Sequence, residues 1–223
     1  MDNQIAGTQL RVCVEEIEQQ ASPYRHNAAC LRDLAGAARL LGEHATAARG
    51  LRLLRAVPDA AFLPVLANFD LPGTVPKGLR AIPSVIELEE AHPPYREETI
   101  TSQITAHAKS EPHIALCLDG RIHEARSAAE TDLALAELGA TLAVLGEFDA
   151  THGVLRDPVL PESRRSGIWM VLAIELFRRG RCTEAQSVLT EFESSGLDSW
   201  CRIHLALGFA GREPWCGYPY PDW

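Results

Sequence analysis

Histidine is the residue of this chain best suited to metal binding or acid–base chemistry, and it occurs eight times: His26, His44, His92, His107, His113, His123, His152 and His204. Two histidines lie one helical turn from another possible ligand, in the pairs Cys201 with His204 and Asp149 with His152. A metal ion needs three or four ligands that converge in space, and no Cys-x-x-Cys or His-Glu-x-x-His motif completes either pair. We therefore predict a buried Cys201, a surface His204, no metal site and no cofactor.

Motifs of the common enzyme classes are missing from the sequence. The only lysines are Lys77 and Lys109, and neither follows a glycine-rich loop of the kind that cradles phosphates. No Gly-x-Ser-x-Gly turn is present to expose a nucleophilic serine. Paired carboxylates such as Glu87 and Glu90 have the spacing of a solvated helix face. The sequence thus predicts no catalytic residue and a protein that is not an enzyme.

One stretch supports an alternative. Residues 58–113 combine a proline-rich segment with His92, His107 and His113. If the fold brings these side chains together, they could form a metal or small-ligand site in a binding protein or an enzyme. A stoichiometric metal that is lost on His107→Ala would favour this alternative.

Composition and charge set further bounds on function. The chain has 223 residues, 46% of them hydrophobic, and a formal net charge of -9. This charge argues against nonspecific nucleic-acid binding, which needs a clustered positive field. The most apolar run, residues 168–177, is too short to span a bilayer, and the first residues do not resemble a signal peptide. The six scattered cysteines indicate reduced thiols, and we expect a cytoplasmic protein of bacterial type.

The elements that position these residues are expected to be helices. Apolar side chains recur at helical spacing from residue 4 to 20, from 27 to 41 and again beyond residue 97. Half of the fourteen prolines lie between residues 58 and 94, where only short helices are expected, around 60–68 and 84–90. We predict an all-α chain of about ten helices in one continuous domain. Its parts are N-terminal helical hairpins (1–57), an irregular proline-rich insert (58–96) and helical repeats with an aromatic tail (97–223).

A repeated glycine marks the turns between helices. A small residue follows it five positions later in four places: Gly42 and Ala47, Gly120 and Ala125, Gly146 and Thr151, and Gly180 and Ala185. Glycine can adopt the left-handed conformation that ends a helix, and a small residue lets the next helix approach closely. The residues before Gly146 and Gly180 repeat in phase with a period of 34, which indicates stacked helical hairpins.

The unit from Ser166 to Ser199 resembles the tetratricopeptide repeat, a family in which antiparallel helical hairpins stack as a right-handed superhelix. The resemblance depends on Trp169, Leu172, Ala173, Leu176, Gly180, Ala185 and Leu189. The preceding unit matches at Leu138, Gly139, Leu142 and Leu155 but departs at Thr151. With an early unit around Gly42 and a weaker one around Gly120, the resemblance covers roughly two thirds of the chain.

The resemblance also implies where a partner would bind. The inner groove of such a superhelix would be lined by Leu133, Ala136, Ala140, Met170, Ile174 and Phe177. These residues are apolar, whereas members of the family that clamp a terminal carboxylate use Lys, Arg and Asn. A carboxylate clamp is therefore not expected, and the groove should take an apolar ligand or part of the chain itself.

The aromatic tail is the candidate part of the chain for that role. Half of all Trp and Tyr residues lie in it: Trp215, Tyr218, Tyr220 and Trp223. Its Tyr-Pro steps favour an extended form. We expect the tail to cap the last hairpin, as terminal repeats require, and the alternative is that it docks a partner or forms a homodimer contact.

Together these features predict a non-enzymatic protein–protein interaction module, an adaptor or scaffold that binds another protein or peptide through an apolar groove. The first alternative is the metal- or ligand-binding protein of residues 58–113. The second is an acidic immunity or inhibitor protein that neutralises a basic enzyme, an idea that only the negative charge supports.

Overall fold

The computed structural model describes residues 3–19, 25–56, 85–91, 94–194 and 199–212. Within these ranges it contains twelve helices, against about ten predicted, and no strand beyond an isolated bridge between Pro94 and Arg212. The prediction of an all-α chain is therefore confirmed. The chain divides into two compact units, Met1–Pro94 with Asp198–Glu213, and Tyr95–Leu197 with Pro214–Trp223.

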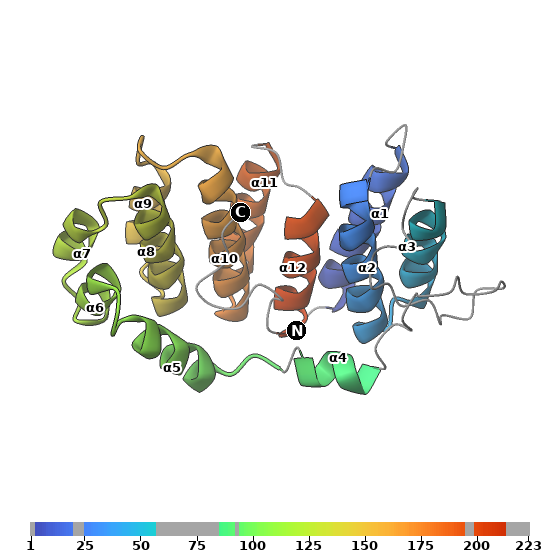
Figure 1. Ribbon diagram of the computed structural model, residues 1–223, viewed down its shortest axis with the longest axis horizontal. Helices are drawn as coiled ribbons and strands as arrows, with labels where there is room; N and C mark the ends of the chain where they lie inside the picture. The colour runs from blue at the N-terminus through green and yellow to red at the C-terminus, as the bar shows by residue number, and fades with distance from the viewer. Residues whose placement is uncertain (1–2, 20–24, 57–84, 92–93, 195–198, 213–223) are drawn as a thin grey trace. The chain divides into compact units, whose positions relative to one another are not determined.

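The first unit contains five described helices: α1 (Asn3–Gln19), α2 (Arg25–Leu40), α3 (His44–Ala56), α4 (Val85–Ala91) and α12 (Ser199–Phe209). Helix α1 pairs with α12 and α2 pairs with α3, the two pairs pack on each other (Figure 1), and α4 packs on α2. The apolar stripe predicted for the first helix is its buried face, formed by Leu10, Cys13, Val14 and Ile17. The spatial neighbours of α1 therefore come from both ends of the described chain.

A buried arginine joins α12 to α1. Arg202 is only 7% exposed. Its Nε and Nη2 donate to the two carboxylate oxygens of Glu16 at 3.0 and 2.8 Å, and its Nη1 donates to Gln9 Oε1 at 3.0 Å. This two-point pairing fixes the register between the first and the last described helix.

The second unit contains seven described helices: α5 (Glu97–His107), α6 (Pro112–Leu118), α7 (Ile122–Ala128), α8 (Asp132–Leu145), α9 (Phe148–Leu155), α10 (Glu162–Arg178) and α11 (Cys182–Ser194). Three antiparallel pairs follow one another, α6 with α7, α8 with α9, and α10 with α11. The first helices of these pairs, α6, α8 and α10, pack side by side in order (Figure 1). The predicted stacking of helical hairpins is thus seen in this unit.

The turns between paired helices follow the predicted glycine pattern. At Gly146 the backbone is left-handed, with φ of 87°. The amides of Gly146 and Glu147 donate to the carbonyls of Ala143 and Leu142 at 3.1 and 2.9 Å, which closes the end of α8. The same conformation occurs at Gly42, Gly120 and Gly180.

The small residue after each turn is buried, as close helix approach requires. Ala47, Ala125 and Ala185 have almost no exposed surface. Thr151 is also fully buried, and its hydroxyl donates to the carbonyl of Glu147 at 3.0 Å. The helix itself satisfies the hydroxyl group, which explains how threonine replaces alanine in this repeat.

The prediction was one continuous domain in three parts, whereas the chain divides into two compact units. The boundary near residue 96 has its counterpart at Pro94 and Tyr95, but α12 belongs with the N-terminal helices, whereas the prediction assigned it to the C-terminal repeats. The short helix predicted at 84–90 is observed as α4. The one predicted at 60–68 lies outside the described residues.

Candidate functional site

The predicted groove residues lie on α8 and at the centre and end of α10. Met170 and Ile174 have no exposed surface and Ala140 has 4%, so none of the three can contact a partner in this structure. Leu133, Ala136 and Phe177 are half-buried. The tail residues Trp215, Tyr218, Tyr220 and Trp223 lie outside the described residues, and their capping or docking role stays a prediction.

The segment from Tyr95 to His107, which includes helix α5, contacts one residue of each of the helices α8 and α10. The segment begins at Tyr95, whose ring centroid lies 3.7 Å from the guanidinium carbon of Arg178 at the end of α10. It ends at His107, whose Nε2 lies 3.6 Å from Glu137 Oε1 on α8. Ile100 and Ile104 between them are buried. A segment of the second unit thus connects the end of α10 with the first half of α8.

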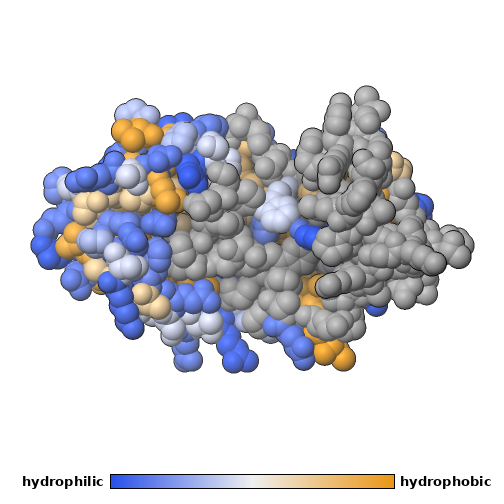
Figure 2. Space-filling model, viewed as in Figure 1, coloured by the Kyte–Doolittle hydropathy of each residue, from blue (hydrophilic) through white to orange (hydrophobic). Residues whose placement is uncertain are grey.

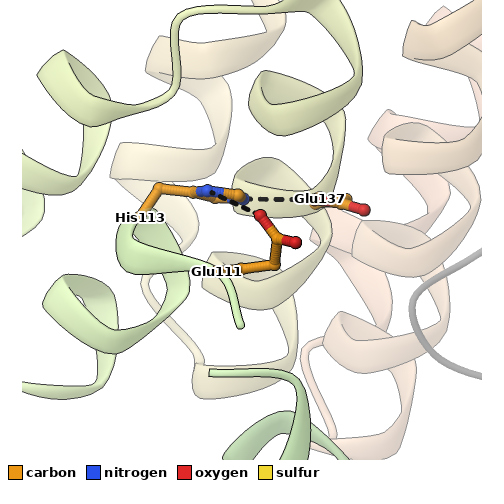
Figure 3. Close-up of side chains that lie close together, drawn as sticks. All are labelled: Glu111, His113 and Glu137. Atoms are coloured by element: carbon orange, nitrogen blue, oxygen red, sulfur yellow. Dashed lines mark hydrogen bonds and ion pairs between the residues drawn. The ribbon is translucent and has the colours of Figure 1, made fainter. Parts of the chain in front are cut away.

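His107 and His113, two of the histidines in the alternative prediction, approach the same carboxylate. His107 is the last residue of α5, and His113 is the second residue of α6, which begins at Pro112. Glu137 comes from α8, on which α6 packs. Glu111 immediately precedes α6 and completes the group (Figure 3). His92 lies outside the described residues.

The imidazole of His113 lies between two carboxylates. Its Nε2 is 3.2 Å from Glu137 Oε2, and its Nδ1 is 3.8 Å from Glu111 Oε2. His113 is only 2% exposed, whereas the side chain of Glu111 is 38% exposed. The group is therefore buried on the side of α8 and open to solvent on the side of Glu111.

The histidines stabilise the ionised form of Glu137. The hydrogen bond from His113 lowers the pKa of this carboxyl below its ordinary value, against the opposing effect of burial, and His107 adds to the lowering. A carboxylate held ionised beside an imidazole can accept a proton, orient the ring or ligate a cation.

A pocket of about 430 Å³ lies between α9, α10 and α11, away from the predicted groove. It is lined by His152, Leu155, Arg156, Glu162, Arg165, Trp169 and Glu191. The ring of His152 meets that of Trp169 edge-on, with centroids 5.9 Å apart. The pocket combines an apolar wall with charged groups of both signs, and its volume is within the range of ligand sites, roughly 300–1,000 Å³.

The two sequence-adjacent pairs do not form metal sites with a third described residue. Cys201 is buried, as predicted, but His204 is fully buried as well, so its predicted surface position is wrong. The reason is that α12 packs on both α1 and α2, where the His204 ring lies edge-on to Trp200 at 5.1 Å. The described cysteines form no disulfide with one another, and burial beside Glu147 raises the pKa of Cys117 to about 11.

Sequence reasoning missed Glu111 and Glu137. Glu137 is 24 residues from His113, and only the packing of α6 on α8 brings the two together. The available signal was the run His107, Glu111, His113, in which possible ligands recur across a turn that Pro112 interrupts.

No family model, curated protein or solved structure matches this chain. Its function must therefore be inferred from its own residues. None of the described helices combines the length and apolar character that crossing a bilayer requires.

Proposed function

We propose that this chain is a non-enzymatic protein-binding module, an adaptor or scaffold built from tetratricopeptide-like hairpins that form a right-handed superhelix. The observation that carries the proposal is the ordered packing of α6, α8 and α10, the first helices of three successive pairs. Stacked repeats of this kind present extended surfaces to other proteins. A cytoplasmic location is part of the proposal, and the lack of disulfides among the described cysteines supports it.

We place the partner at the pocket between α9, α10 and α11, because Met170 and Ile174 of the predicted groove are buried. Trp169 and Leu155 give this pocket an apolar wall, and Arg156 and Glu191 are exposed at it. Over α6 to α9 the face in Figure 2 shows apolar side chains scattered among hydrophilic ones. These features suit a peptide segment that inserts one apolar side chain between charged neighbours.

Site-directed photo-crosslinking in the native host tests this function. A photoreactive amino acid replaces Arg156 at the pocket, and in a matched control it replaces Ser102, which is exposed on α5. We expect a defined protein adduct from position 156 and none from position 102.

The purified partner must then bind the full chain directly. Arg156→Glu should weaken this binding at least about tenfold, which corresponds to about 1.4 kcal/mol. Lys109→Glu makes the same charge change on an exposed residue outside the pocket lining and should leave affinity unchanged. Equal affinities for both variants, or no adduct at position 156, would contradict the proposal.

A further inference from the structure

The cluster around His113 is suited to a cation. Glu111, His113 and Glu137 each offer one ligand atom, and the three atoms lie within 4.8 Å of one another. Two of these residues flank the start of α6 and the third comes from α8, so the packing of two helices sets the spacing. We propose that these three side chains bind one divalent transition-metal ion.

The separations are close to those of a coordination sphere. Ligands that bind a tetrahedral Zn²⁺ at about 2.0–2.2 Å stand about 3.3–3.6 Å apart. His113 Nε2 and Glu137 Oε2, 3.2 Å apart, are already close to this spacing. Glu111 is the partner that must move, because its carboxylate lies beside Nδ1, the other ring nitrogen of His113. Its half-exposed side chain can turn towards Nε2 by rotation about its own torsions.

The charge balance also favours a divalent ion. Two carboxylates lie beside one imidazole that has almost no exposed surface. With a neutral imidazole the group bears two negative charges, and like charges this close oppose each other. A divalent cation at the same point offsets both charges, and it leaves a coordination position for water on the side where Glu111 is exposed.

His107 acts as a positioning residue for this site. Its Nε2 lies 3.6 Å from Glu137 Oε1, the oxygen that does not face His113. Ligating carboxylates are commonly held by such outer partners, and loss of one lowers metal affinity about 10–100-fold.

The donor set distinguishes among metals. One imidazole nitrogen and two carboxylates suit first-row transition ions, whereas Ca²⁺ and Mg²⁺ prefer six or more oxygen ligands. Within that row Zn²⁺ binds more tightly than Mn²⁺ or Fe²⁺ at a given site. Zn²⁺ is therefore the probe with which the site should be tested.

Isothermal titration of the full-length protein with Zn²⁺ at pH 7 provides the test. The background is Cys182→Ser, because Cys182 is the exposed thiol among the described cysteines. We expect one equivalent to bind at this site. Glu111→Gln and Glu137→Gln should each weaken binding at least about 100-fold, and His107→Ala about 10–100-fold.

Three further measurements separate binding at this site from binding elsewhere and from misfolding. His123→Ala removes an exposed histidine from α7 and should leave the affinity unchanged. Absorption of the Co²⁺ complex should show nitrogen and oxygen ligation without thiolate charge transfer. Glu111→Gln alters a half-exposed side chain, so circular dichroism should report an unchanged fold.

The proposal is overturned by any of three results. One is the absence of Zn²⁺ binding, which leaves His113 as a hydrogen-bonded core histidine. Another is binding that survives both glutamine substitutions. The third is a thiolate spectrum, which would assign the ion to cysteines.

Discussion

Glu137 is the residue on which the candidate cation site depends. One of its carboxylate oxygens lies 3.2 Å from His113 Nε2, and the other lies 3.6 Å from His107 Nε2. Each histidine comes from a different helix, so the carboxylate joins α5 and α6 to α8. Even without a metal ion, this arrangement stabilises the ionised carboxylate and links its protonation to the stability of the fold.

Glu137→Gln should destabilise the protein in a way that depends on pH. The pKa of Glu137 is lowered in the folded state from an ordinary value of 4.5. The ionised carboxylate therefore contributes stability above pH 4.5, and that contribution is lost as the pH falls through the folded pKa. Urea unfolding with a chelator present, at several pH values from 7 to below 4, should show a difference from wild type that shrinks on acidification.

Glu130→Gln is the matched control, since Glu130 is exposed just before α8. Its effect on the free energy of unfolding should be small at every pH. If the free energy of unfolding of Glu137→Gln stays below that of wild type by the same amount down to acid pH, the amide disturbs packing. The charge of Glu137 would then contribute nothing to stability.

At the scale of elements, the close approach of α8 to its neighbours depends on one glycine. A Cβ atom at Gly139 would lie 2.7 Å from Ile168 Cδ1 on α10 and 3.1 Å from Val154 Cγ1 on α9. Both neighbours are buried, so either side chain can shift only by displacing other core residues. The small residue thus lets one helix contact two others.

Gly139→Leu should lower the free energy of unfolding by about 1–3 kcal/mol through overpacking. Gly153→Leu on α9 is the comparison, because its Cβ would meet only Arg126 Nη1, at 3.5 Å. Both substitutions gain helix propensity, so Gly153→Leu should stabilise by up to about 1 kcal/mol. Thermal and urea unfolding measure the stability of both variants. Equal destabilisation would show that the close packing of α9 and α10 on Gly139 does not determine the cost of a side chain there.

Elements whose signals are local were predicted well from the sequence. Gly146 and Gly180 end helices because their left-handed backbone conformation is intrinsic to glycine. Pro112 begins α6 for an equally local reason, because its fixed φ already suits the first turn of a helix. The pairing of His113 with Glu137 could not be read in this way, because it requires the packing of α6 on α8, which no short motif encodes.

At the scale of the whole chain, the first unit is assembled from segments far apart in sequence. Glu16 and Arg202 are 186 residues apart, yet their side chains pair directly. Residues 97–223 were predicted as one part of the chain. Helix α12 nevertheless packs on α1 and α2, and its Cys201, His204 and Leu205 are buried.

Arg202→Ala should therefore weaken the first unit more than an equivalent change on its surface. It leaves Gln9 buried without this donor and Glu16 without its two-point partner, at a cost of about 2–3 kcal/mol. Arg49→Ala is the matched comparison, because Arg49 pairs with Glu18 of the same helix α1 in a more exposed position, and its loss should cost under about 1 kcal/mol. Urea unfolding followed by circular dichroism compares the two. Equal losses would mean that the pairing of α12 with α1 adds no more than a surface ion pair, and that apolar burial alone holds these helices together.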